Sequence, residues 1–188
     1  MRMRIACNVG ILGLALAGCV TARDPAVVPT AALKLAGNWA VERQTDRITG
    51  APMPSAFLPT RSSHTREAYP RRAHIQLVCF KGEPLVRFAF EVRIGATRNS
   101  EFGYRFDAKP GGTADARFLQ DYKTVVIEDR AEVSRFLGEM AKSETLYILI
   151  RSLNAGRTSA EFRLEGAEVA IKQALAGCMP KPSRTASR

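Results

Sequence analysis

A chain of 188 residues is long enough for one domain of ordinary size, which can bury a core without help from a bound metal. Lysine and arginine outnumber aspartate and glutamate by 28 to 18, and the formal net charge of +10 favours anionic partners such as lipid phosphates or acidic glycans. The excess of arginine over lysine and the abundance of alanine are also typical of G+C-rich genomes, so charge alone does not identify a partner.

The N-terminus has the pattern of a secretory signal. Arg2 and Arg4 precede an uncharged apolar run over residues 5–18. A membrane-spanning helix needs about 20 apolar residues, so this run is too short to remain as an anchor. We therefore expect residues 1–18 to be a removed signal peptide, and we expect no nucleic-acid partner for an exported chain.

The signal ends in LAGC at residues 16–19, which resembles the lipobox of bacterial lipoproteins. The resemblance implies that the thiol of Cys19 is lipidated and that several acyl chains anchor the protein stably. Because Val20 follows instead of aspartate, it also implies an outer-membrane address, with the protein facing the periplasm. The alternative is cleavage after Ala17, which would leave Cys19 as a free thiol near a soluble N-terminus.

Residues 19–36 are small and apolar and include Pro25 and Pro29, so we expect them to form a flexible tether. The globular domain is expected over residues 37–178, starting near the only tryptophan, Trp39. This side chain is expected in the core, with a surface anchor for a partner as the alternative.

Prolines break any helix over residues 49–63, and a polar, basic stretch follows over residues 61–74. One interpretation is a solvated loop. The other is a surface that contacts an anionic or protein partner. Its candidate partner-binding residues are Arg61, Arg66, Tyr69, Arg71 and Arg72.

Apolar residues then alternate with period two, which predicts strands at residues 73–80 and 86–94. The short KGEP connection between them favours an antiparallel hairpin. Further strands are predicted at residues 102–106 and 123–128.

At Asp129 the period changes to that of a helix, with Glu132 placed for a capping box. A second hairpin is predicted from residues 146–150 and 160–164, and a second helix runs from Gly166 to Cys178. Residues 179–188 are expected to form a disordered basic tail. The prediction is a single α+β domain of mostly antiparallel, sandwich-like sheet with two packed helices.

Two cysteines remain once Cys7 leaves with the signal and Cys19 serves as the anchor. Cys79 lies on the apolar face of its strand, and Cys178 continues the apolar stripe of the last helix. In an oxidising compartment we expect a structural disulfide between them, and closing a loop of about 100 residues is worth roughly 4–5 kcal/mol. A redox pair is the alternative, although the chain has no C-x-x-C spacing.

The sequence shows no constellation typical of catalysis. Neither of the two histidines, His64 and His74, lies in a metal-binding motif. No nucleophile elbow or phosphate-binding glycine pattern is present, and acidic residues are scattered singly. We therefore expect no metal, no cofactor and no enzymatic activity, with an enzyme whose site is dispersed as the alternative.

The order of features resembles the VasI/TagO-like accessory proteins associated with the type VI secretion system. The resemblance lies in the strand at Trp39, LVC at residues 77–79, YRFD at 104–107, FRLEG at 162–166 and the final Cys178. The basic stretch and the lipobox depart from that family. A looser resemblance to exported invasion-associated proteins of alphaproteobacteria is equally defensible. Both imply a non-enzymatic envelope protein that binds an envelope protein or an anionic envelope component.

Overall fold

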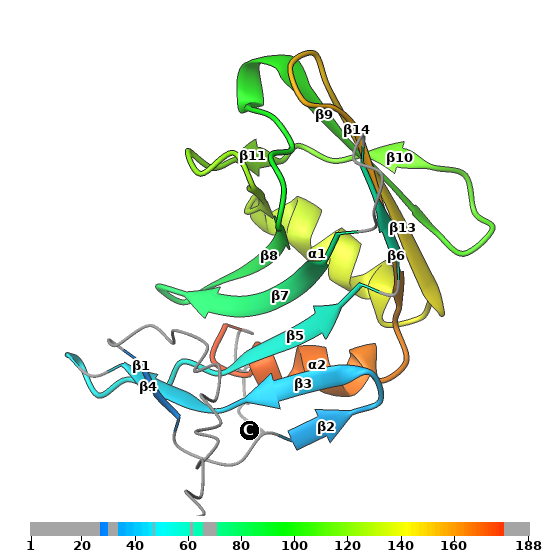
Figure 1. Cartoon of the computed structure of the whole chain (residues 1–188). Coiled ribbons are helices and arrows are strands. Elements are labelled where there is room, and N and C mark those ends of the chain that lie inside the picture. The colour runs from blue at the N-terminus through cyan, green and yellow to red at the C-terminus, as the bar shows by residue number, and fades with distance from the viewer. Residues whose placement is uncertain (1–26, 30–33, 47, 61, 66–70, 179–188) are drawn as a thin grey trace, which may run out of the picture.

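Two antiparallel sheets face each other across the core of the molecule (Figure 1). The computed structural model describes residues 27–29, 34–46, 48–60, 62–65 and 71–178. The predicted signal peptide, Cys19 and the predicted tail lie outside the described residues. The five-stranded sheet has the order β10 (Gly112–Thr113), β9 (Ser100–Phe106), β13 (Thr145–Ser152), β14 (Gly156–Arg163) and β6 (Ser62–His64).

The second sheet has seven strands and carries the hairpin expected from residues 73–94. Lys81 and Gly82 connect its two strands with φ values of 52° and 80°, the backbone geometry of a tight two-residue hairpin turn. The order is β11 (Arg117–Phe118), β12 (Thr124–Ile127), β8 (Glu83–Phe90), β7 (Ala73–Phe80), β5 (Ser55–Pro59), β3 (Trp39–Glu42) and β2 (Lys34–Ala36).

Aromatic side chains join the two sheets to the first helix, α1 (Arg130–Met140). The ring of Phe88 lies 5.0 Å from that of Phe102 in the opposite sheet and 6.0 Å from that of Phe136 on α1, measured between centroids. All three side chains are buried. Such edge-on and tilted contacts add to the stabilisation from apolar burial. The alternating residues of the strands and the stripe of the helix therefore form one core, and the α+β single-domain prediction is confirmed.

The two predicted helices are present. The Asp129 carboxylate accepts a hydrogen bond from the Glu132 backbone N–H at 2.9 Å, so the predicted N-cap of α1 is confirmed. The second helix, α2 (Ala167–Ala174), packs on β3, β5 and β7. It ends before Cys178, because the chain turns after Leu175 and does not continue the helical stripe.

Several segments differ from the predictions. Strands occur within the residues expected to form a tether: β2 pairs with β3, and β1 (Val27–Pro29) pairs with β4 (Gln44–Asp46). Strand β8 ends at Phe90 instead of continuing to residue 94. Strand β5 was not predicted, because two of the prolines that precede and end it obscured its alternation.

Candidate functional site

The connections between strands meet at one end of the sandwich and surround a surface cleft of about 680 Å³. We call this region the loop end. It consists of the β8–β9, β11–β12 and β13–β14 connections, together with residues 65, 71 and 72 between β6 and β7. The residues that line the cleft include Arg71, Glu91, Arg93, Gly95, Tyr122 and Lys123.

Positive charge dominates the cleft. Arg71, Arg93 and Lys123 line it, and Glu91 is the one carboxylate among its described lining residues. The guanidinium of Arg93 lies 5.4 Å from the centroid of the Tyr122 ring, at cation–π distance. Within the described part of the chain, neither Arg93 nor Lys123 forms an ion pair. The cleft therefore offers cations that an anionic ligand could neutralise.

Two hydrogen bonds, one to a carbonyl and one to a carboxylate, hold Arg72 against the start of the β8–β9 connection. The Glu91 N–H donates to the carbonyl of Arg72 at 3.1 Å, and the Arg72 N–H donates to the Glu91 carboxylate at 3.2 Å. The backbone of Arg72 thus engages both the N–H and the carboxylate of Glu91. Arg71 and Arg72 are both exposed, and Arg71 lines the cleft.

The turn that carries Tyr122 and Lys123 is fixed by Asp121. Its carboxylate accepts hydrogen bonds from the backbone N–H groups of Lys123 and Thr124, each at 2.9 Å, and from the Thr124 hydroxyl at 2.6 Å. Burial opposes ionisation of this carboxyl, but these hydrogen bonds outweigh it, and the pKa of Asp121 is lowered. The Ile94 N–H donates to the Tyr122 carbonyl at 2.7 Å and joins this turn to the β8–β9 connection.

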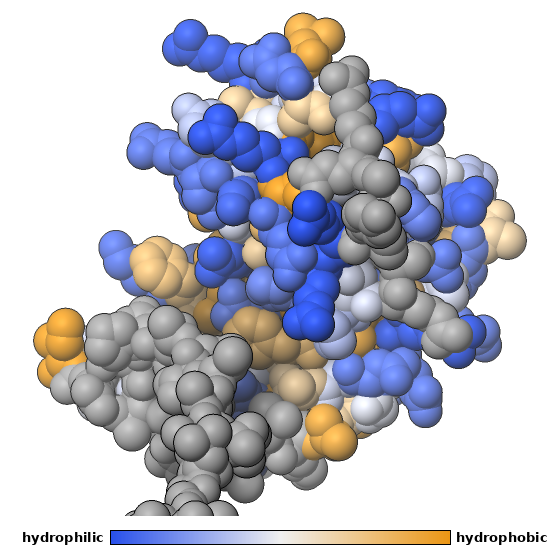
Figure 2. Space-filling view, in the orientation of Figure 1, coloured by the Kyte–Doolittle hydropathy of each residue, from blue (hydrophilic) through white to orange (hydrophobic). Residues whose placement is uncertain are grey.

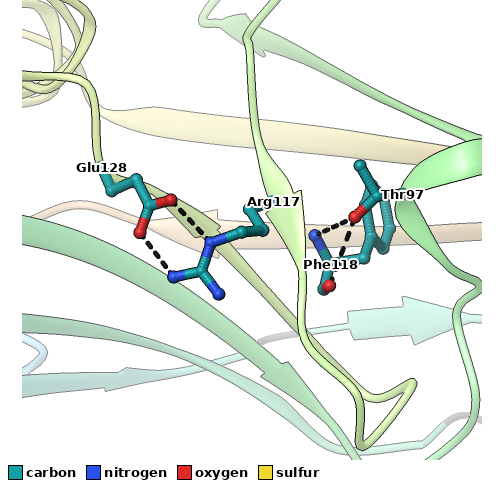
Figure 3. A network of polar contacts seen from close by, with 4 residues as sticks. All are labelled: Thr97, Arg117, Phe118 and Glu128. Atoms are coloured by element: carbon teal, nitrogen blue, oxygen red, sulfur yellow. Dashed lines mark hydrogen bonds and ion pairs between the residues drawn. The ribbon is translucent and has the colours of Figure 1, made fainter.

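Figure 3 shows a further contact, which joins the β8–β9 connection to β11. The hydroxyl of Thr97, in the short helix η1 (Thr97–Asn99), donates to the Phe118 carbonyl at 3.3 Å and accepts from its N–H at 3.1 Å. Beside it, Arg117 pairs with Glu128 through two hydrogen bonds of 2.6 Å, which raises the pKa of Arg117 and lowers that of Glu128. The loops around the cleft are therefore braced by specific side chains.

Gly95 brings the β8–β9 connection into direct contact with the β13–β14 hairpin. Its φ is +122°, and a Cβ there would lie 2.1 Å from the Ser100 hydroxyl oxygen and 2.5 Å from that of Ser152. Only glycine tolerates both the backbone conformation and the contact. Gly95 and the β13–β14 hairpin, which meet at this close contact, both line the cleft.

The structure describes two of the five predicted partner-binding residues. Arg71 and Arg72 lie at the loop end, whereas Arg61, Arg66 and Tyr69 lie outside the described residues. The prediction of a solvated loop over residues 61–74 was wrong in part. Residues Ser62–His64 form the edge strand β6 on β14, and β7 already begins at Ala73.

Sequence reasoning missed Arg93, Tyr122 and Lys123 as site residues. Arg93 fell within the strand predicted over residues 86–94, and Tyr122 and Lys123 lie in a turn with no motif of its own. A tyrosine and a lysine adjacent in a turn were the only available signal, and it is a weak one. Folding, not local sequence, brings these residues together.

The predicted disulfide is present. Cys79, at the end of β7, is bonded to Cys178 beyond α2, with the two Cα atoms 5.7 Å apart. Trp39 is fully buried and its indole N–H donates to the Leu164 carbonyl at 3.4 Å, so its assignment to the core is confirmed. Both features lie away from the loop end and stabilise the domain.

The histidines are not gathered into a site. His64 is exposed on β6, and His74 on β7 is partly buried, with its ring 5.9 Å from that of Phe57. Burial, and then the charge of Arg87, lower the pKa of His74. Across the described ranges, no group of three or more histidine, cysteine, aspartate or glutamate residues could hold a metal ion.

None of the helices in the described part of the chain is long and apolar enough to cross a membrane. Comparison of the chain with protein-family models, curated proteins and solved structures found no match. The loop end and the N-terminal sequence are therefore the features that bear on function.

Proposed function

We propose that the chain is a lipid-anchored protein of the bacterial envelope that acts as a non-enzymatic binding or accessory module. Its partner is an anionic envelope component, which it binds through the loop end. The observation that carries this proposal is the cluster of Arg71, Arg93 and Lys123 around one cleft, with Arg93 stacked on Tyr122. The lipobox-like residues ending in Cys19 support an envelope location.

The chemistry of the cleft favours phosphate or carboxylate groups. Guanidinium and ammonium groups form charge-assisted hydrogen bonds with such oxygens, and these bonds are stronger than neutral ones. Because the loops are already braced by Asp121, Thr97 and Gly95, little conformational freedom is lost on binding. The resemblance of the sequence to secretion-associated accessory proteins supports a binding role over catalysis.

Co-sedimentation tests this proposal. The chain from residue 19, carrying Cys19→Ser to remove the lipid, is mixed with peptidoglycan sacculi or with vesicles containing anionic phospholipid, at low and moderate salt. The loop-end variant is Arg93→Ser with Lys123→Ser. The matched control is Arg105→Ser with Lys109→Ser, because Arg105 lies over Tyr147 at 5.8 Å and the charge change is the same.

The wild type and the control variant should bind at least one of the two materials, and binding should weaken as salt screens the charges. Each cation near an anionic surface contributes about 1 kcal/mol, so the loop-end variant should lose roughly tenfold or more in affinity. Equal affinity of the loop-end variant and the wild type, or no binding by any protein, would contradict the proposal.

A further inference from the structure

We infer that the loop end docks on the surface of an anionic phospholipid bilayer, with Leu153 inserted below the headgroups and the cations of the cleft on the lipid phosphates. The inference rests on the proposed function and names its partner class. Its basis is an exposed apolar side chain at the rim of the basic cleft. Leu153 directly precedes Asn154 and Ala155, which line that cleft, and its residue surface is 86% exposed.

The view of the surface agrees with this arrangement. In Figure 2 hydrophobic surface lies at the uppermost tip of the molecule, where Figure 1 places the turn between β13 and β14. Hydrophilic residues flank that tip. An isolated apolar tip flanked by polar and charged groups is suited to a surface that is itself layered, with charge outside and hydrocarbon beneath.

The tip that carries Leu153 is held in place. The Leu153 N–H donates to the Asn99 carbonyl at 3.0 Å, and the Ala155 N–H donates to the Ser152 hydroxyl oxygen at 3.2 Å. Gly95 packs against the hydroxyl of the same serine. Because the turn is already ordered, inserting the leucine does not require the hairpin to change conformation.

The neighbouring residues match the layers of a bilayer. Tyr122 is 45% exposed, and tyrosine favours the boundary between headgroups and acyl chains. Arg71, Arg93 and Lys123 supply attraction to anionic headgroups, while an apolar side chain gains from burial below them. An acidic glycan would use the cations and the tyrosine but would leave Leu153 in water. The exposed Leu153 therefore favours a lipid bilayer over an acidic glycan as the partner.

An environment-sensitive fluorophore tests the insertion. Leu153→Cys is introduced into the chain from residue 19 with Cys19→Ser, and the new thiol is labelled with nitrobenzoxadiazole. The matched control carries the label at Leu35→Cys, since Leu35 is 69% exposed but lies on β2, at the opposite end of the molecule in Figure 1. Vesicles contain either phosphatidylglycerol with phosphatidylcholine or phosphatidylcholine alone.

The label at position 153 should brighten severalfold and shift to the blue with anionic vesicles but not with neutral ones, and the label at position 35 should not respond. Without any label, Leu153→Ser should weaken binding to anionic vesicles about tenfold and leave any binding to sacculi unchanged.

Two results would overturn the inference and keep the proposed function: salt-sensitive binding to anionic vesicles with an unresponsive label at position 153, or loop-end binding to sacculi alone. An equal response at positions 35 and 153 would also overturn it, because lipid would then contact no particular face. Absence of binding to both vesicles and sacculi would remove the proposed function as well.

Discussion

Gly37 and Gly166 pack against each other with no space for a side chain on either. A Cβ on Gly37 would lie 2.3 Å from the carbonyl oxygen of Glu165, and a Cβ on Gly166 would lie 2.0 Å from that of Ala36. The Asn38 N–H donates to the same Glu165 carbonyl at 3.0 Å. This contact fastens the turn between β2 and β3 to the turn that leads into α2.

Replacing Gly166 by alanine should therefore destabilise the domain by at least about 2 kcal/mol, since both a strained positive φ and a backbone clash are introduced. Gly50→Ala is the matched control, because Gly50 also has a positive φ of +70°, but a Cβ added there would meet no atom within 4 Å. It should cost about 1 kcal/mol. Urea unfolding measures both changes, and equal losses would show that the close contact does not matter.

The Cys79–Cys178 bond closes a loop with a sequence separation of 99 residues and joins β7 to the segment after α2. Replacing both cysteines by alanine should lower the free energy of unfolding by about 2–5 kcal/mol, chiefly because the unfolded chain is no longer constrained. Thermal unfolding with and without reductant provides the check: reductant should lower the melting temperature of the wild type towards that of the variant. Identical melting of oxidised wild type and variant would speak against a stabilising role.

The cap of α1 gives a smaller and more local prediction. Asp129→Ala removes the acceptor for the Glu132 N–H and should cost about 1 kcal/mol, whereas Asp129→Asn keeps an acceptor and should cost only a few tenths. Chemical denaturation of the three proteins measures the difference. If alanine and asparagine were equivalent, the side-chain hydrogen bond would contribute nothing.

His74 makes stability depend on pH. Its pKa is lowered from the ordinary value of 6.5 by burial and then by Arg87, so the unfolded chain takes up a proton at a higher pH than the folded one. This contribution is complete above pH 6.5 and is lost as the pH falls through 6.5 towards the folded pKa. In His74→Gln, the urea midpoint of unfolding should vary less with pH over that window than it does in the wild type. Parallel profiles for the two proteins would refute the assignment.

Local signals explain which elements could be predicted. Every second residue from Ala73 to Cys79 is apolar, and Asp129 with Glu132 marks the start of α1, so both elements can be recognised from nearby residues alone. Strand β5 and the edge strand β6 depend on partners distant in sequence. Ser159, for example, pairs with His64. Short strands of this kind follow from tertiary pairing more than from their own composition.

The candidate site, too, could be predicted from the sequence only in part. Arg71 and Arg72 stood out because they belong to a run of basic residues, and Arg71 does line the cleft. Arg93 and Tyr122 come from different connections, and only the folded chain places the guanidinium over the ring. Cys79 and Cys178 are the exception among distant pairs, since two apolar-face cysteines in an exported chain have few alternatives.

Each partner proposed for the loop end belongs to the envelope, so the proposal depends on export and lipid anchoring at Cys19. Metabolic labelling with an alkyne fatty acid, followed by membrane fractionation, measures this directly. The wild type should carry the label and sediment with membranes, and Cys19→Ala should be unlabelled and move to the soluble fraction. An unlabelled wild type in the soluble fraction would contradict the anchored module.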